Sequence, residues 1–107
     1  MQNVALLGFG TVGASVARIL DERVSDVNLT SILVRAGKEY VDPRATSDFD
    51  ALLSDPALDT VVECMGGLTP AYEYIKAALT ANKNVVTSNK AVVSAHFEEF
   101  MTLAAEA

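Results

Sequence analysis

The sequence has few of the residues that characterise disulfide-stabilised, fibrous or disordered proteins. Cys64 is its only cysteine, which excludes an intrachain disulfide and a metal site built on paired thiolates. Six glycines and three prolines occur among 107 residues, of which 50% are hydrophobic, and this composition excludes collagen-like, low-complexity and disordered chains. We therefore expect one folded domain with one core and no bound metal.

Long hydrophobic runs and positive charge are also scarce. The chain has no apolar run of roughly 18 residues, the length of a membrane span, and its first apolar segment reaches Gly8 without a basic leader or a cleavage site. We expect a soluble, cytoplasmic protein without a membrane span or signal peptide. The formal net charge of −6 argues against a nucleic-acid partner, which needs a basic face. One phosphorylated small molecule stays compatible with this charge, since backbone N–H groups at a helix N-terminus can hold phosphate.

Four segments have the composition of buried strands, because they are short, rich in apolar or β-branched residues and bounded by turn residues. They cover residues 4–7, 28–35, 60–64 and 84–87. The interval 37–46 contains Asp42-Pro43 and has little periodicity, so we expect a loop there with room for one very short strand.

Helical patterns alternate with these strands. The predicted helices cover residues 11–23, about 48–53, about 70–79, 89–93 and 96–107. Ser47 or Asp48 is expected to cap the second of them, Pro70 to hold the first position of the third, and Asn89 to cap the fourth. The last helix is expected to carry four apolar residues on one side, Phe97, Phe100, Met101 and Ala104.

The alternation of strands and helices predicts a parallel sheet with helices on both faces, joined by right-handed crossovers. We therefore expect an α/β fold over residues 1–107, a Rossmann-type doubly wound parallel sheet in a single three-layer α/β/α domain. The final helix ends without glycine, proline or a basic last turn, so we expect the domain to be part of a longer protein.

A glycine-rich turn links the first predicted strand to the first helix. Residues 8–13 read GFGTVG and match G-x-G-x-x-G, the fingerprint of dinucleotide-binding turns, in the required strand-to-helix context. Gly8 permits the tight turn, Gly10 lets the backbone approach a pyrophosphate, and Gly13 lets the helix lie close to the strand. The alternative is an ordinary flexible turn, which leaves the coincidence with both element boundaries unexplained.

The end of the second predicted strand bears on the choice of cofactor. NAD-binding folds usually place an acidic residue there to hydrogen-bond the ribose 2′-OH, whereas this chain has Arg35. A guanidinium suits a 2′-phosphate, and Lys38 adds positive charge nearby. We expect NADP or NAD to bind, with NADP favoured; a solvated arginine at a strand end is the alternative.

The loop after the third predicted strand is expected to reach the same crevice, beyond the carboxyl ends of the strands. Met65, Gly66 and Gly67 leave room where the nicotinamide half of the cofactor would pass. A simple turn is the alternative.

The loop after the fourth predicted strand, with Thr87 and Asn89, should face this crevice too. Lys90 follows in the first turn of a helix, where a cation opposes the helix dipole. A bound anion or a proton-transfer role would explain the lysine, and a flexible exposed side chain is the alternative.

Together these motifs resemble those of homoserine dehydrogenase. The resemblance spans essentially the whole chain and rests on GFGTVG at 8–13, LVR at 33–35, VVECMGG at 61–67, PAYEYIKAAL at 70–79, NVVTSNKAVVSAH at 84–96 and the closing EEF. Many dehydrogenases share the first motif, but an E-x-x-G-G loop followed by VVT-x-NKA is more specific. Ser88 departs from the family, which more often has alanine or proline there, and leaves the shape of this loop open.

The resemblance implies the NAD(P)-binding domain of an enzyme that interconverts L-homoserine and L-aspartate 4-semialdehyde, in the biosynthesis of threonine, isoleucine and methionine. It puts Arg35 at the adenosine ribose and brings Lys90, the implied catalytic residue, to the cofactor and the reacting end of the substrate. The expected cofactor-binding residues are Gly8, Phe9, Gly10, Thr11, Val12, Gly13, Arg35, Lys38, Met65, Gly66, Gly67, Thr87, Asn89 and Lys90.

Members of that family continue into a substrate-binding and dimerisation domain. The resemblance therefore implies a homo-oligomeric full-length protein and inactivity of these 107 residues alone. Two other functions stay open: another oxidoreductase of amino-acid metabolism with the same N-terminal domain, and a stand-alone NAD(P)-sensing module.

Other polar and aromatic residues receive weaker interpretations. Glu63 ends a strand in the crevice, where it would orient the lysine or a ribose hydroxyl, or simply be solvated. His96 and Cys64 are interpreted as a helix-start polar residue and a packed small hydrophobe. Tyr72 and Tyr74 belong to a helix that we expect to be remote from the loops.

Overall fold

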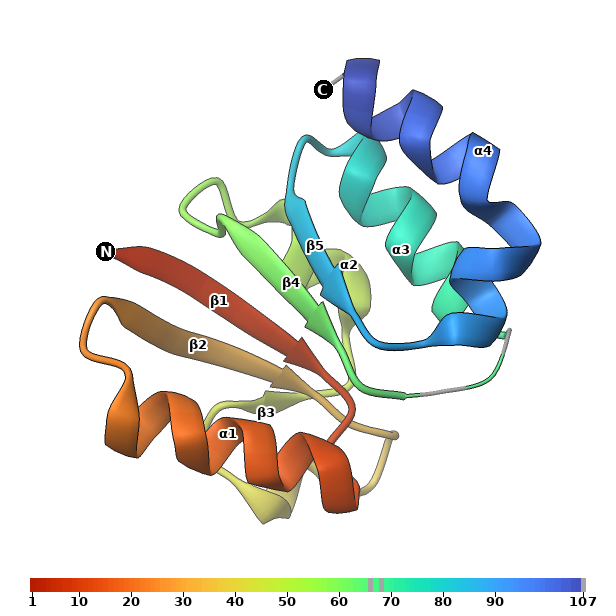
Figure 1. Ribbon diagram of the computed structural model, residues 1–107. Helices are drawn as coiled ribbons and strands as arrows, with labels where there is room; N and C mark the ends of the chain where they lie inside the picture. The colour runs from red at the N-terminus through yellow and green to blue at the C-terminus, as the bar shows by residue number, and fades with distance from the viewer. Residues whose placement is uncertain (66, 68, 107) are drawn as a thin grey trace.

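The computed structural model describes residues 1–65, 67 and 69–106 and consists of a parallel β-sheet flanked by helices (Figure 1). Its elements are β1 (Gln2–Leu7), α1 (Thr11–Arg23), β2 (Val27–Leu33), the 3₁₀ turn η1 (Glu39–Val41), β3 (Ala45–Thr46), α2 (Phe49–Ser54), β4 (Thr60–Glu63), α3 (Ala71–Thr80), β5 (Asn84–Thr87) and α4 (Lys90–Glu106). The predicted α/β alternation is confirmed. The two-residue strand β3 is the very short strand that the sequence allowed within the expected loop 37–46.

The strands lie in the order β3-β2-β1-β4-β5, and every neighbouring pair is parallel. The chain begins in the middle of the sheet, moves outward to β3 and then crosses to β4 on the other side of β1. This reversal confirms the doubly wound, Rossmann-type sheet. It occurs between β1 and β4, where Leu7 pairs with Glu63, and ligands of such sheets bind beyond the strand ends at this point.

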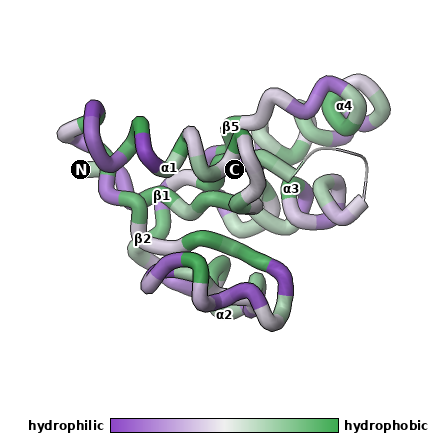
Figure 2. Tube along the Cα trace, turned by 90° about the horizontal axis from the view of Figure 1, so that it is seen from below, coloured by the Kyte–Doolittle hydropathy of each residue, from purple (hydrophilic) through white to green (hydrophobic). Residues whose placement is uncertain are grey.

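The two faces of the sheet are covered by different helices (Figure 2). Val4 and Leu6 of β1 pack in one cluster with Ala17 of α1. Ala5 and Leu7 face the opposite way, into a cluster formed with α2 and α3. All four strand side chains are buried, because β1 is central and both of its faces are covered.

α4 packs on α3 and has a kink at His96, whose φ of −129° and ψ of 25° are not helical. Phe100 is buried against Ile75 of α3. Phe97 and Met101 are each 55% exposed, so the apolar residues expected on one side of this helix do not form one buried face.

Two local expectations change in the structure, and one open alternative is decided. β2 ends before Arg35, which lies in the following loop, and Pro70 is the N-cap of α3 rather than its first residue. Asp48, not Ser47, caps α2, because its carboxylate accepts a hydrogen bond from the Ala51 N–H at 3.0 Å. None of the helices in the described part of the chain has the length and hydrophobicity needed to cross a membrane.

Candidate functional site

The glycine-rich turn brings the start of α1 against the end of β1. Gly8 has a φ of +102°, a conformation that glycine adopts readily and other residues rarely do. A Cβ atom on Gly13 would lie 2.3 Å from the carbonyl oxygen of Gly8, so only glycine permits this approach. A Cβ on Gly10, the N-cap of α1, would have no atom within 4 Å. The backbone at Gly10 can thus be approached closely, and Thr11 and Val12 of the first turn are exposed. An accessible helix N-terminus of this kind can receive an anion.

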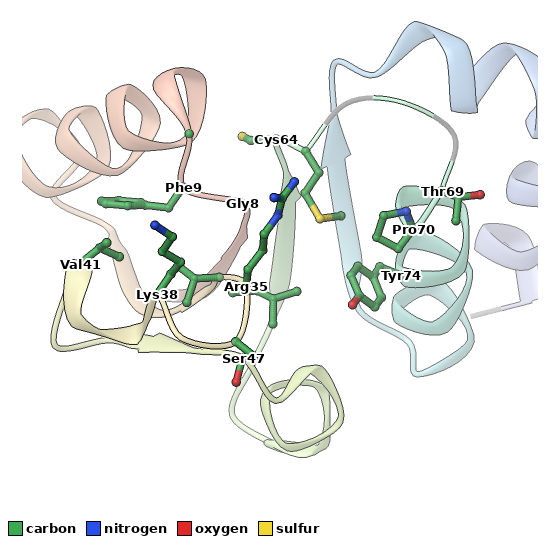
Figure 3. A pocket seen from close by; sticks show the side chains of 15 residues that line it. Gly8, Phe9, Arg35, Lys38, Val41, Ser47, Cys64, Thr69, Pro70 and Tyr74 are labelled. Atoms are coloured by element: carbon green, nitrogen blue, oxygen red, sulfur yellow. The ribbon is translucent and has the colours of Figure 1, made fainter.

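A cavity of about 680 Å³ lies beyond the carboxyl ends of β1, β2 and β4 (Figure 3). This volume is in the range of small-molecule and cofactor sites. The residues that line it are Gly8, Phe9, Gly10, Leu33, Val34, Arg35, Ala36, Lys38, Val41, Ser47, Cys64, Met65, Thr69, Pro70 and Tyr74. Six of the residues expected to bind a cofactor are therefore brought together, namely Gly8, Phe9, Gly10, Arg35, Lys38 and Met65.

Two cations from the loop after β2 face this cavity. Figure 3 shows the Arg35 side chain reaching across it toward Cys64 and the Lys38 side chain next to Phe9. The Lys38 ammonium also lies 5.9 Å from the centroid of the Tyr40 ring. Among the residues that the structure describes, neither cation forms an ion pair.

The neighbouring acid, Glu39, makes hydrogen bonds elsewhere. Its carboxylate accepts from the Gly37 N–H at 2.8 Å and from the Ser47 hydroxyl at 2.7 Å. These bonds, that from Ser47 first, hold the pKa of Glu39 below its ordinary value. In the described part of the chain, the Glu39 carboxylate forms no ion pair with Arg35 or Lys38.

The far wall of the cavity comes from α3 and the residues before it. Thr69, Pro70 and Tyr74 lie there, across from the loop after β2 (Figure 3). The Tyr74 ring stacks on Phe49 of α2 with the ring centroids 4.1 Å apart. The expectation that Tyr74 lies remote from the loops is wrong, because α3 begins beside the carboxyl ends of the strands.

Buried polar groups join the loops that follow β4 and β5. Glu63, only 1% exposed, accepts hydrogen bonds from the Met65 N–H at 2.6 Å and from the Thr87 hydroxyl at 2.6 Å. The Thr87 oxygen accepts from the Asn89 N–H at 3.0 Å, and the Asn89 amide donates to the Gly67 carbonyl. The interpretation of Glu63 as a solvated carboxylate is therefore wrong.

Lys90 is the first residue of α4, and its side chain is exposed. Asn89 caps this helix as predicted, since its side-chain oxygen accepts from the Val92 N–H at 3.2 Å. Within the described ranges the Lys90 ammonium has no ion pair. Thr87, Asn89 and Lys90 do not belong to the described lining of the cavity, but they lie at the same edge of the sheet.

The other candidate residues are distributed around the first two loops. Thr11 and Val12 are exposed on the first turn of α1, and Gly67 is exposed with a φ of +71°. Gly66 lies outside the described residues. Cys64 borders the cavity, and its burial, followed by the charge of Glu63, raises the pKa of its thiol, as expected of a packed side chain rather than a nucleophile.

His96 lies away from the cavity, with its ring centroid 4.0 Å from that of Tyr72, between α3 and α4. No group of three or more His, Cys, Asp or Glu side chains placed to hold a metal ion exists in the described part of the chain.

Residues 8–107 match a protein-family model described as homoserine dehydrogenase, NAD binding domain. The chain belongs to this family. The matched range begins at the first glycine of the turn and includes all three loops of the crevice. Family membership thus agrees with the resemblance seen in the sequence motifs, and the chain is a domain of the NAD(P)-binding type.

Individual homoserine dehydrogenases show the same similarity. That of Lactococcus lactis is 36% identical over 120 residues, which cover 95% of this chain and 27% of the relative. A crystal structure of the S. aureus homoserine dehydrogenase matches with a TM-score of 0.83 at 35% sequence identity. The match covers 98% of this chain and 30% of the S. aureus chain. For the Thiobacillus denitrificans homoserine dehydrogenase structure the TM-score is 0.86 at 29% sequence identity. That match covers 98% of this chain and 27% of the Thiobacillus denitrificans chain. The chain spans less than a third of these relatives.

Proposed function

We propose that this chain binds NAD(P) for an enzyme that interconverts L-homoserine and L-aspartate 4-semialdehyde. The observation that carries the proposal is the contact between Gly13 and Gly8, which holds the N-terminus of α1 at the mouth of the cavity. In doubly wound folds the pyrophosphate of a dinucleotide is held at this place. The bound cofactor supplies the hydride chemistry, and the protein supplies binding, orientation and electrostatics.

The described residues fit such a ligand. The first turn of α1 contains no acidic residue that would repel a pyrophosphate, and Gly10 leaves the approach to it open. The N–H groups around Gly10, Thr11 and Val12 would hold the phosphates. The cavity beyond Phe9 and Arg35 would receive the adenosine half.

The charge of the cavity supports NADP as the preferred cofactor. Arg35 and Lys38 face the cavity without an ion pair among the described residues, and two N–H groups of a guanidinium match a phosphate well. Glu39 is the nearby acid that would otherwise suit a ribose 2′-OH. It is held by Ser47 and Gly37 instead.

Lys90 is the proposed catalytic group at the nicotinamide end. It extends from the carboxyl edge of β5, next to the loop with Met65 and Gly67 that would pass the nicotinamide. From this position its ammonium would contact the cofactor and the reacting end of the substrate. The substrate site and a homo-oligomeric state are proposed for the whole protein only.

Calorimetric titration of the chain with NADPH and NADH tests the cofactor part of this proposal. We expect saturable binding of both, tighter for NADPH, and no homoserine-dependent reduction of NADP⁺ by the chain alone. Failure of both dinucleotides to bind would refute the assignment of the cavity. For the reaction, the full-length protein is assayed with L-homoserine and NADP⁺, and the absence of oxidation there would refute the proposed substrate.

A further inference from the structure

In the described part of the chain, Glu63 is the only charged side chain that is buried, with 1% of its surface exposed. An ionised carboxylate that leaves water loses several kcal/mol of hydration unless charged or hydrogen-bonding partners replace it. Asn89, 9% exposed, is the only other buried polar residue there. Both lie at the carboxyl edge of the sheet, Glu63 at the end of β4 and Asn89 directly before α4.

A network of hydrogen bonds connects Glu63, Thr87 and Asn89 with the loop after β4. Glu63 accepts from the Met65 N–H at 2.6 Å and from the Thr87 hydroxyl at 2.6 Å. The Thr87 oxygen accepts from the Asn89 N–H at 3.0 Å, and the Asn89 amide donates to the Gly67 carbonyl at 2.5 Å. Two of these bonds, from Thr87 to Glu63 and from Asn89 to Gly67, therefore join the end of β4 and its following loop to the end of β5 and its following loop.

The network also reaches the start of α4. The Asn89 side chain that bonds Gly67 accepts from the Val92 N–H at 3.2 Å, and so sets the first turn of the helix with Lys90 at its head. The lysine side chain is long and flexible, so its reach depends on where the backbone places its Cα atom. Loss of the Glu63 carboxylate would leave the Thr87 hydroxyl and the Met65 N–H without this acceptor.

We infer that Glu63 is a positioning residue. Through Thr87 and Asn89 it holds the two loops that meet the nicotinamide half of the cofactor, and it fixes the point from which Lys90 extends. This inference rests on the proposed function. Because Glu63 is buried, it acts through these neighbours and not by touching the ligand.

Two ligands that differ only at the nicotinamide distinguish this positioning role from a general structural role. NADPH carries the nicotinamide ring, whereas 2′-phospho-ADP-ribose has the same adenosine half and pyrophosphate but no nicotinamide. In the chain, Glu63→Gln should weaken NADPH binding about tenfold, the loss expected when a hydrogen bond to a buried charge is removed. Binding of 2′-phospho-ADP-ribose should change by less than about twofold, within the scatter of independent sites.

Thr87 provides a matched pair of variants. Thr87→Val removes the hydroxyl and should reproduce the selective loss. Thr87→Ser keeps the hydroxyl and should restore most of the NADPH affinity that Thr87→Val loses. The double variant Glu63→Gln/Thr87→Val should bind NADPH no more weakly than the weaker single variant, because both changes break one link. Glu99→Gln is the control, since this carboxylate also accepts a hydroxyl hydrogen bond, from Tyr72 at 2.8 Å, but between α3 and α4.

An equal loss of affinity for both ligands would overturn the inference, because it would mark Glu63 as a general structural residue. Unchanged NADPH affinity in Thr87→Val would overturn it as well, and this variant decides the matter if Glu63→Gln does not fold. Failure of the wild-type chain to bind either ligand would refute the proposed function itself, and with it any role of this hydrogen-bond network in binding.

Discussion

A Cβ atom on Gly13 would stand 2.3 Å from the carbonyl oxygen of Gly8 and 2.9 Å from its carbonyl carbon. The first turn of α1 and the end of β1 thus touch through their backbones. Gly10, in the same turn, would meet nothing within 4 Å if it carried a Cβ. One glycine of the motif is therefore required by the fold, and the other leaves open the space that a ligand would occupy.

Gly13→Ala and Gly10→Ala should consequently have opposite effects. Gly13→Ala should lower the free energy of unfolding by about 1–3 kcal/mol, because the backbones must separate to admit the methyl group. Gly10→Ala should leave stability within about 0.5 kcal/mol and abolish measurable NADPH binding. Urea denaturation and calorimetry measure the two effects. Normal NADPH binding by Gly10→Ala would contradict the placement of the pyrophosphate.

Arg35→Ala should weaken NADPH binding by about tenfold or more, as expected for a charge-assisted hydrogen bond, and leave NADH binding nearly unchanged. The ratio of the two dissociation constants is the quantity to compare. Arg18→Ala, an exposed arginine of α1 outside the cavity, is the control. Tighter binding of NADH than of NADPH, insensitive to Arg35→Ala, would contradict the proposed preference.

The stability of the chain should fall in acid partly through Arg44. Its guanidinium contacts Asp21 at 2.9 Å and Asp42 at 2.9 Å, and hydrogen bonds from Arg44 hold the pKa of both carboxyls below the ordinary value. Carboxyls with a lowered folded pKa stabilise the fold above their unfolded pKa of about 4, and this contribution disappears as the pH falls through the lowered value.

Arg44→Met should therefore lower the free energy of unfolding by about 1 kcal/mol or less at pH 7, because the pairs are partly exposed. The difference from wild type should shrink below about pH 4. Urea denaturation between pH 7 and 3 measures it, with Arg23→Met as the control. A difference that grows on acidification would show that the pairs do not carry this effect.

Two phenylalanines of α4 provide a test of how this helix packs. Phe100 is 8% exposed and contacts α3, whereas Phe97 is 55% exposed. Phe100→Ala should lower the free energy of unfolding by about 3 kcal/mol, and Phe97→Ala by less than about 0.5 kcal/mol. Equal effects in urea denaturation would mean that the helix is rotated relative to this arrangement.

Local signals in the sequence were enough to predict most of the elements. α1 spans Thr11–Arg23 and β5 spans Asn84–Thr87, as predicted, because apolar periodicity and turn residues act over a few neighbouring positions. The near wall of the cavity was also predictable. Gly8, Phe9 and Arg35 lie at or just beyond the carboxyl ends of predicted strands, and these ends meet at one edge of a parallel sheet.

The far wall and the buried network depended on tertiary structure. No local pattern around Tyr74 or Ser47 in the sequence predicts that the packing of the domain brings these residues to the cavity. From the sequence, Glu63 could be interpreted either as a solvated carboxylate or as a group that orients the lysine or a ribose hydroxyl. Its contact with Thr87 follows from the pairing of β4 with β5, which places Thr87 opposite Glu63. The chemistry of each residue and the start and end of each element are local properties of the chain. Which residues become neighbours depends on strand order and register, because these are selected by the packing of the whole domain.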